Sequence, residues 1–145
     1  MWNATRSHCR NLRDTSRARF RFAGSTPRRV ARDGVSTVDV GNVAALGGAC
    51  PGAVACTVTF IVGGNRAVES DTRISSTDVA GFSTARRPAR RKLDVQSVMV
   101  HESGHTLGFA HVNARDVVMN PFVRRGGVSG RVLGRGDAIA SNAKY

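Results

Sequence analysis

The chain has 145 residues, of which 41% are hydrophobic, and it carries a formal net charge of +12. This length suits a single domain, and the hydrophobic content can form a packed core, so the composition excludes a wholly disordered chain. No stretch approaches the ~18 consecutive apolar residues of a membrane-spanning helix, and no apolar signal-peptide segment follows Met1.

The positive charge comes almost entirely from arginines scattered between Arg6 and Arg135. Such charge is compatible with nucleic acid, an anionic surface or an acidic substrate as partner, and also with a solvated arginine-rich surface. Aromatic residues are not interleaved with the arginines as a base-stacking platform requires. We therefore favour the solvated surface over nucleic-acid binding.

The N-terminal third begins with a basic stretch. Residues 2–15 are polar and rich in arginine, and they indicate either the end of a helix or a loose arm. Polar and apolar residues alternate over Arg19–Phe22, which predicts a short half-buried strand. We accordingly divide one domain into a basic N-terminal stretch, 1–34, and a core, 35–145.

Three further strands are predicted in the first half of the core. Val35–Val43 is rich in valine, Cys56–Val62 is strongly β-prone, and Arg66–Ser75 alternates apolar with polar residues. Gly63-Gly64-Asn65 between the last two predicts a hairpin. The glycine-rich segment 46–52 is expected to be a loop.

Cys50 and Cys56 flank a short Pro-Gly segment that can turn the chain back on itself. A disulfide between them is one interpretation, expected of an exported protein, and two small buried thiols are the other. Cys9 is left over in either case.

Two helices are predicted in the second half, after a loop over 76–92. Asp94 is a candidate N-cap for a helix covering about Val95–Leu107, whose apolar positions approximate the helical period. After an irregular stretch from Gly108 to about Gly134, a last short helix is expected over about Gly136–Lys144. Strands followed by helices predict an α+β fold.

Residues 101–111 read HESGHTLGFAH and contain a candidate metal site. His101 and His105 are four residues apart, so a helix places them on one face about 6 Å apart along its axis, and both imidazoles can bind one ion. Glu102 lies beside the metal without coordinating it and is positioned to take a proton from a metal-bound water.

The third ligand is expected to be His111, which a continued helix would carry to the wrong side. Gly108 can adopt the left-handed conformation that ends a helix, and the turn then brings His111 back to the ion. Three histidine ligands leave a fourth position for water, as in catalytic zinc sites.

The eleven-residue string is the signature of the metzincin zinc peptidases, and by average residue usage it arises by chance in well below roughly one in ten thousand such chains. Val117-Val118-Met119-Asn120-Pro121 resembles the methionine turn of that group, in which the methionine forms a hydrophobic floor below the zinc ligands. An ordinary core methionine is the alternative interpretation of Met119.

Among metzincins the chain is most similar to the matrixins, the matrix metalloproteinases and their bacterial relatives. The resemblance covers about 35–145 and includes Val68–Ile74, Leu93–Val98 and the closing segment from Asp137 to Tyr145. Val112, after the third histidine, departs from the residue that each subfamily favours.

The resemblance implies a metzincin catalytic domain with a mixed twisted sheet, an active-site helix and a C-terminal helix, and with the family's N-terminal strand and most of its first helix missing. It further implies a secreted, monomeric zinc endopeptidase that acts on peptide or protein substrates through a water activated at the zinc. Substrate would pair with an edge strand within Arg66–Ser75, and Pro121 and Phe122 would line the pocket for the residue after the cut. A structural Ca²⁺ is compatible with the resemblance.

Two other functions stay open at this point. One is a zinc-holding domain without catalysis, and the other is a basic nucleic-acid-binding protein. Neither membrane binding nor a second cofactor is indicated.

Overall fold

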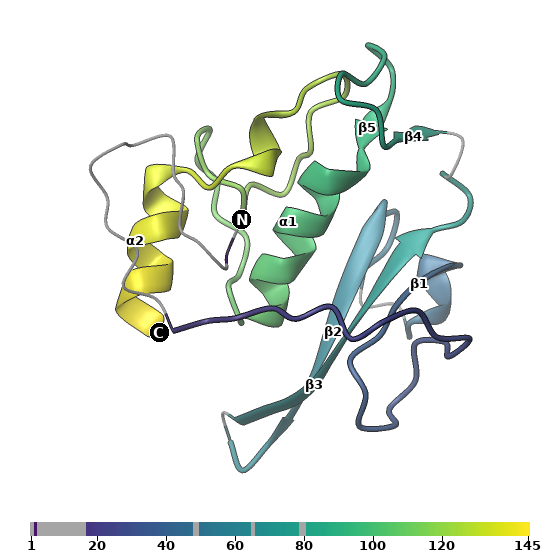
Figure 1. Ribbon diagram of the computed structural model, residues 1–145, viewed down its shortest axis with the longest axis vertical. Coiled ribbons are helices and arrows are strands. Elements are labelled where there is room, and N and C mark those ends of the chain that lie inside the picture. Colours follow the sequence, from purple (N-terminus) through teal and green to yellow (C-terminus); the bar gives the residue numbers. More distant parts are fainter. Residues whose placement is uncertain (1, 3–16, 48–49, 65, 79–80) are drawn as a thin grey trace. The chain divides into compact units, whose positions relative to one another are not determined.

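The computed structural model describes residues 2, 17–47, 50–64, 66–78 and 81–145. The chain forms two compact units, one of Gly24–Gly81 and one that combines Met1–Ala23 with Phe82–Tyr145. The first holds a three-stranded sheet and the second holds the helices α1 and α2 (Figure 1). The predicted α+β class is therefore confirmed.

The sheet consists of β1 (Val38–Gly41), β2 (Ala55–Val62) and β3 (Arg66–Ser75) in the order β1-β3-β2. The predicted hairpin is confirmed, because β2 and β3 pair antiparallel, whereas β1 pairs parallel to β3. The expectation that Arg66–Ser75 contains an edge strand is wrong. β3 lies in the centre of this sheet, and β2 is one of its edges.

Polar side chains explain why β1 joins β3 on the side away from β2. The buried carboxylate of Asp71 accepts a hydrogen bond from the Thr37 backbone N–H at 2.7 Å. The Arg73 guanidinium donates to both carboxylate oxygens of Asp39, at 2.8 and 2.7 Å. Such paired, charge-assisted bonds are strong and directional, so they determine which strand lies beside β3.

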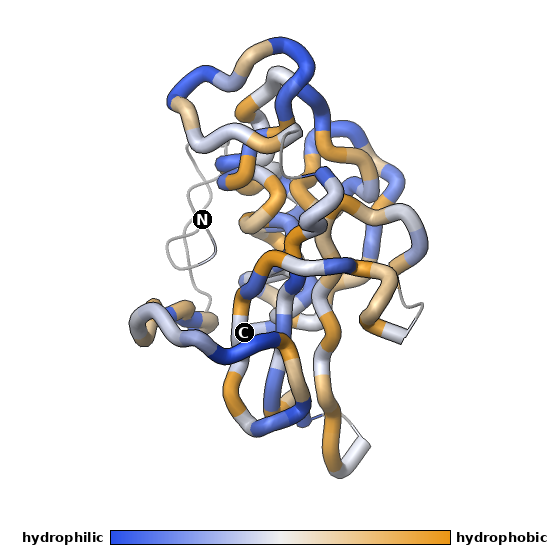
Figure 2. Tube along the Cα trace, turned by 90° about the vertical axis from the view of Figure 1, so that its right-hand side faces the viewer, coloured by the Kyte–Doolittle hydropathy of each residue, from blue (hydrophilic) through white to orange (hydrophobic). Residues whose placement is uncertain are grey.

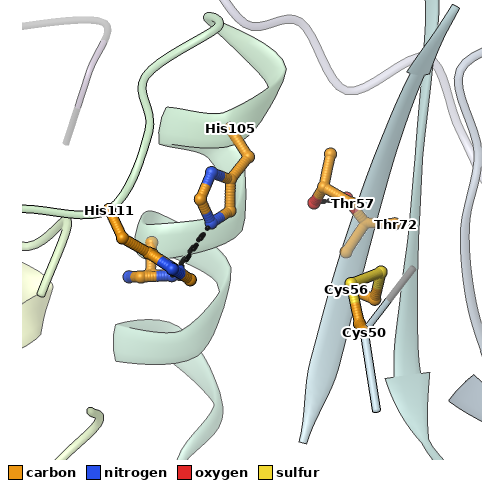
Figure 3. Close-up of a disulfide and its surroundings, with 7 residues drawn as sticks. Cys50, Cys56, Thr57, Thr72, His105 and His111 are labelled. Atoms are coloured by element: carbon orange, nitrogen blue, oxygen red, sulfur yellow. Dashed lines mark hydrogen bonds between the residues drawn. A yellow bond between two sulfur atoms is a disulfide. The ribbon is translucent and has the colours of Figure 1, made fainter. Parts of the chain in front are cut away.

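A disulfide closes the loop before β2. It joins Cys50 to Cys56, whose Cα atoms are 6.0 Å apart, and so decides between the two interpretations of these cysteines. Figure 3 shows it beside Thr57 and Thr72, whose hydroxyl oxygens are 2.8 Å apart across β2 and β3. A short 3₁₀ turn at Val43–Ala45 follows β1.

The helical unit contains both predicted helices. The strands β4 (Phe82–Ser83) and β5 (Leu93–Asp94) pair parallel, and β5 leads directly into α1 (Val95–Thr106). A 3₁₀ turn at Ser129–Arg131 precedes α2 (Arg135–Lys144).

The core of this unit gathers side chains from both ends of the chain: Trp2, Ala18, Val100, Leu107, Val118, Met119 and Leu133. The Trp2 indole N–H donates to the Val100 carbonyl at 2.7 Å, and its ring stacks on Phe109 with centroids 5.2 Å apart. Trp2 is thus tied to α1, although it lies 98 positions before Val100 in the chain.

The strand predicted at Arg19–Phe22 is wrong. This segment has no strand assignment, and Phe22 is 84% exposed. Alternation alone produces a strand only where a neighbouring strand accepts the ladder of hydrogen bonds. The predicted end of a helix before it falls mainly on residues 3–16, outside the described residues.

Candidate metal centre

The start of α1 is determined by Asp94, as predicted. Its carboxylate accepts hydrogen bonds from the Ser97 backbone N–H at 2.8 Å and hydroxyl at 2.7 Å, and the Arg131 guanidinium donates to both of its oxygens at 2.9 and 2.6 Å. The hydrogen bond from Arg131 is the main reason that the pKa of Asp94 lies below its usual value. Because the cap sets the residue at which the helix begins, it also sets which side chains share a face of the helix. The face that carries the histidines follows from this start.

The end of α1 is determined by Gly108, which has φ +75°. Its N–H donates to the His105 carbonyl at 2.8 Å, and the Phe109 N–H donates to the Gly104 carbonyl at 3.0 Å. These two bonds form a Schellman motif, which satisfies the last carbonyls of a helix around a left-handed residue. The chain reverses here, as the sequence predicts, and carries His111 back toward α1.

The end of α2 supports the same turn. The Tyr145 hydroxyl donates to the Leu107 carbonyl at 2.7 Å, and the Lys144 ammonium donates to the Gly108 carbonyl at 3.1 Å. The same ammonium lies 5.1 Å from the centre of the Phe109 ring. A cation is favourable at a helix C-terminus, where carbonyl groups concentrate negative charge.

The three histidines of the motif meet at one point. The Nε2 atoms of His101, His105 and His111 form a triangle with all three sides equal to 3.1 Å. Figure 3 shows the rings of His105 and His111 turned toward each other. Within the described residues, these three side chains form the group of His, Cys, Asp or Glu that is close enough to hold a metal.

Backbone carbonyls orient two of the rings. Nδ1 of His101 lies 2.7 Å from the Val118 carbonyl, and Nδ1 of His105 lies 2.8 Å from the Phe109 carbonyl. A carbonyl only accepts, so in each neutral ring Nδ1 carries the proton and Nε2 presents a lone pair. Two lone pairs 3.1 Å apart repel unless a cation lies between them, so this arrangement is one that a metal stabilises.

The triangle fits zinc. Nitrogen atoms bound at ~2.0–2.1 Å to a tetrahedral Zn²⁺ lie ~3.3 Å from one another, close to the observed spacing. Burial, the largest cause, lowers the pKa of His101 to about 4 and also lowers the pKa of His111, so protons compete weakly for these ligands. His101 is 5% exposed while His111 is exposed, so one side of the site is open to solvent.

Met119 lies beneath the histidine-bearing helix. It is 3% exposed and packs so closely against Gly104 that a Cβ atom at residue 104 would overlap the Met119 sulfur. The same Cβ would lie 2.9 Å from the Trp2 ring. The Met119 carbonyl also accepts from the Val112 N–H at 2.9 Å, next to His111. Gly104, which sequence reasoning did not single out, permits this close approach.

Val118 connects the site to α2. Its carbonyl contacts Nδ1 of His101, and its N–H donates to the Asp137 carboxylate at 2.6 Å. Asp137 also accepts from the Gly134 N–H at 2.8 Å, at the start of α2. Burial is the main reason that the pKa of Asp137 is raised. The backbone of one residue, Val118, thus links the start of α2 to the His101 ring.

A pocket of about 550 Å³ adjoins His101 within the same unit. Its apolar wall includes Val117, Val123 and Val132, and Phe122 at the wall is 84% exposed. Its polar lining includes Ser97, Arg115, Asp116, Asn120, Arg124 and Ser129.

The sequence matches the family described as Matrixin over residues 19–145. The chain belongs to the matrixin family. Neither a curated protein nor a solved structure was found to match it. The three-histidine site and the family together identify this matrixin as a zinc metalloendopeptidase, and its triad and Glu102 fit a zinc-binding catalytic site.

The sequence motif locates most of the matrixin site but not all of its supports. The histidines, Asp94 and Gly108 lie where the spacing predicts, because each acts within a few residues of α1. A glycine inside a helix is the one local sign in the sequence of the contact between Gly104 and Met119. That sign does not indicate which residue packs against the glycine.

The predicted substrate pocket stays a prediction. Phe122 belongs to the lining of the pocket beside His101, and Pro121 does not, although it precedes Phe122 in the chain.

Proposed function

We propose that His101, His105 and His111 hold the catalytic zinc of this matrixin, with Glu102 as the general base. The meeting of three Nε2 atoms at 3.1 Å supports this assignment, since two of the rings have Nδ1 against a carbonyl. Glu102 follows His101 on α1 and is 5% exposed, so its carboxylate belongs to the same buried region.

Zinc bound by three histidines supplies Lewis acidity and lowers the pKa of its water toward neutrality. In the proposed reaction, Glu102 accepts a proton from the attacking water and delivers it to the leaving amine. The Val118 and Phe109 carbonyls keep the rings of His101 and His105 in the metal-binding tautomer throughout.

The pocket beside His101 is proposed to receive the side chain that follows the cleaved bond. Its apolar wall supports binding of a substrate side chain next to the metal, and Phe122 lies at its open side. In this proposal Gly108 and Met119 support the ligands without contacting substrate.

The test is zinc analysis of the purified chain combined with cleavage of a casein substrate, with and without a chelator. We expect about one zinc per chain and chelator-sensitive cleavage. Glu102→Ala is expected to retain zinc and lose cleavage, whereas His105→Ala is expected to lose zinc. Wild-type-like turnover by Glu102→Ala, or stoichiometric zinc in His105→Ala, would contradict the assigned roles.

A zinc-loaded chain that never cleaves a polypeptide would favour the non-catalytic alternative. Preferential DNA binding without cleavage would favour the nucleic-acid alternative. A matrixin acts on protein substrates, so both alternatives are weaker than the peptidase.

Matrixins are typically secreted, and we propose that this one acts outside the cell as a monomer. The Cys50–Cys56 disulfide supports an oxidising environment. Among the described residues, no helix has the length and apolar character needed to cross a membrane. Sedimentation at micromolar concentration tests the monomer, and a dimer would contradict it.

A further inference from the structure

Two basic segments lie side by side in the helical unit. The Arg125 guanidinium donates to the Arg91 carbonyl at 3.1 Å, and the Gly126 N–H donates to the Lys92 carbonyl at 2.8 Å. Figure 2 shows hydrophilic stretches along the loops at the top of the view. Figure 1, which shares the vertical axis of that view, labels β4 and β5 near its top. We call the cationic residues of the two basic segments the basic ridge: Arg86, Arg87, Arg90, Arg91, Lys92, Arg124 and Arg125.

The ridge is an ordered surface. Pro88 is buried, and the Lys92 N–H donates to the Ala89 carbonyl at 2.8 Å, which closes a turn in the first segment. Gly126 approaches so closely that a Cβ atom there would lie 2.8 Å from the Arg90 Cα. The arginines of the ridge are exposed while the backbone beneath them is held in place.

Few carboxylates balance this charge. Between residues 82 and 145, Asp94, Glu102 and Asp137 are buried, and Asp94 is paired with Arg131. Asp116 is the exposed acidic side chain of this range. The ridge therefore produces a positive potential that the same part of the chain leaves largely uncompensated.

The ridge continues into the pocket beside the metal ligands. Arg124 belongs to the ridge and also lines the pocket that contains His101. Arg115 adds a second cation to that lining, against the single carboxylate of Asp116. A polypeptide that places one side chain in this pocket therefore meets Arg124, a member of the ridge, at the same site.

We propose that the basic ridge binds acidic residues of the substrate downstream of the cleaved bond, so that this peptidase prefers acidic polypeptides. The inference rests on the proposed role of the pocket. An acidic polypeptide is favoured over nucleic acid because the ridge joins a pocket beside a peptidase site, and the exposed Phe122 ring belongs to that pocket.

Binding tests the ridge independently of turnover. In the Glu102→Ala chain, a labelled peptide with Glu-Glu-Asp after the scissile bond is compared by fluorescence anisotropy with one carrying Gln-Gln-Asn. We expect at least about fivefold tighter binding of the acidic peptide at low salt, which is lost at about 0.5 M NaCl. Adding Arg90→Glu and Arg91→Glu should weaken acidic-peptide binding about tenfold.

The matched control is a double charge reversal outside the helical unit, Arg29→Glu with Arg66→Glu, which changes the net charge equally. It should change the preference less than about twofold. Equal binding of the two peptides, equal loss in the control, or displacement of the acidic peptide by a DNA duplex at lower concentration than by poly-glutamate would overturn the ridge. If the acidic peptide binds as expected but the zinc-loaded wild type cleaves neither peptide, the ridge stands and the proposed peptidase role fails.

Discussion

Replacing Gly104 with alanine tests whether close packing under α1 supports the metal site. The added Cβ would overlap the Met119 sulfur and would lie 2.9 Å from the Trp2 ring and 3.2 Å from the Met119 methyl carbon. Met119 and Trp2 are 3% and 2% exposed, so neither can move into solvent without losing buried contacts.

Two opposing effects determine the size of the change. Overpacking a core with one extra methyl group costs about 1–3 kcal/mol, while alanine gains up to about 1 kcal/mol over glycine inside a helix. We expect a net loss of about 1–2 kcal/mol in the free energy of unfolding. With a urea slope near 2 kcal/mol/M, the midpoint falls by about 0.5–1 M.

The overlap also displaces the residue that follows Val118, whose carbonyl orients the His101 ring. Loss of an interaction that orients a ligand typically weakens metal affinity about tenfold or more. Bound metal itself stabilises the folded chain, so urea unfolding is measured with chelator present and then reports the loss of stability from packing alone. Zinc titration measures the change in metal affinity separately.

Gly136→Ala is the matched control, because it adds the same methyl group to a helix where the nearest contact is a partly exposed Val117 methyl at 3.0 Å. It should leave stability within about 1 kcal/mol and zinc affinity unchanged. A Gly104→Ala chain with wild-type stability and zinc affinity would refute the reasoning, because Met119 and Trp2 would then adjust freely.

Three further predictions concern other supports. Gly108→Ala should destabilise the chain by about 1–2 kcal/mol and weaken zinc binding, because φ is +75° there, and an unchanged zinc titration would contradict this. Asp94→Asn should lower the free energy of unfolding at neutral pH. Because the folded-state pKa of Asp94 is depressed, the stability advantage of the wild type is full above the ordinary pKa near 3.9. This advantage disappears as pH falls through the lower folded-state pKa. A pH-independent difference in urea unfolding would exclude the ion pair as its cause. Cys50→Ser with Cys56→Ser should cost about 2 kcal/mol by thermal unfolding, and unchanged stability would show that this short loop restricts the unfolded chain little.

Whether a segment becomes a strand, and where that strand lies in its sheet, depends on tertiary pairing. Arg19–Phe22 alternates as a strand should, yet whether a segment becomes a strand depends on a partner elsewhere in the chain. Arg66–Ser75 alternates as a strand and is one, but its central place follows from β1 joining it through the Arg73–Asp39 and Thr37–Asp71 hydrogen bonds, each of which spans 34 positions of the chain.

The sequence by itself determined the local geometry of the metal centre. The Asp94 cap, the four-residue spacing of His101 and His105, and the left-handed Gly108 each act within one or two helical turns, where backbone stereochemistry leaves few alternatives. Only the tertiary structure decided what holds that geometry. Trp2 contacts Val100 of α1, and Asp137 contacts Val118 beside His101, although both are distant from their partners in the chain. The local spacing of apolar residues does not predict packing between such distant segments.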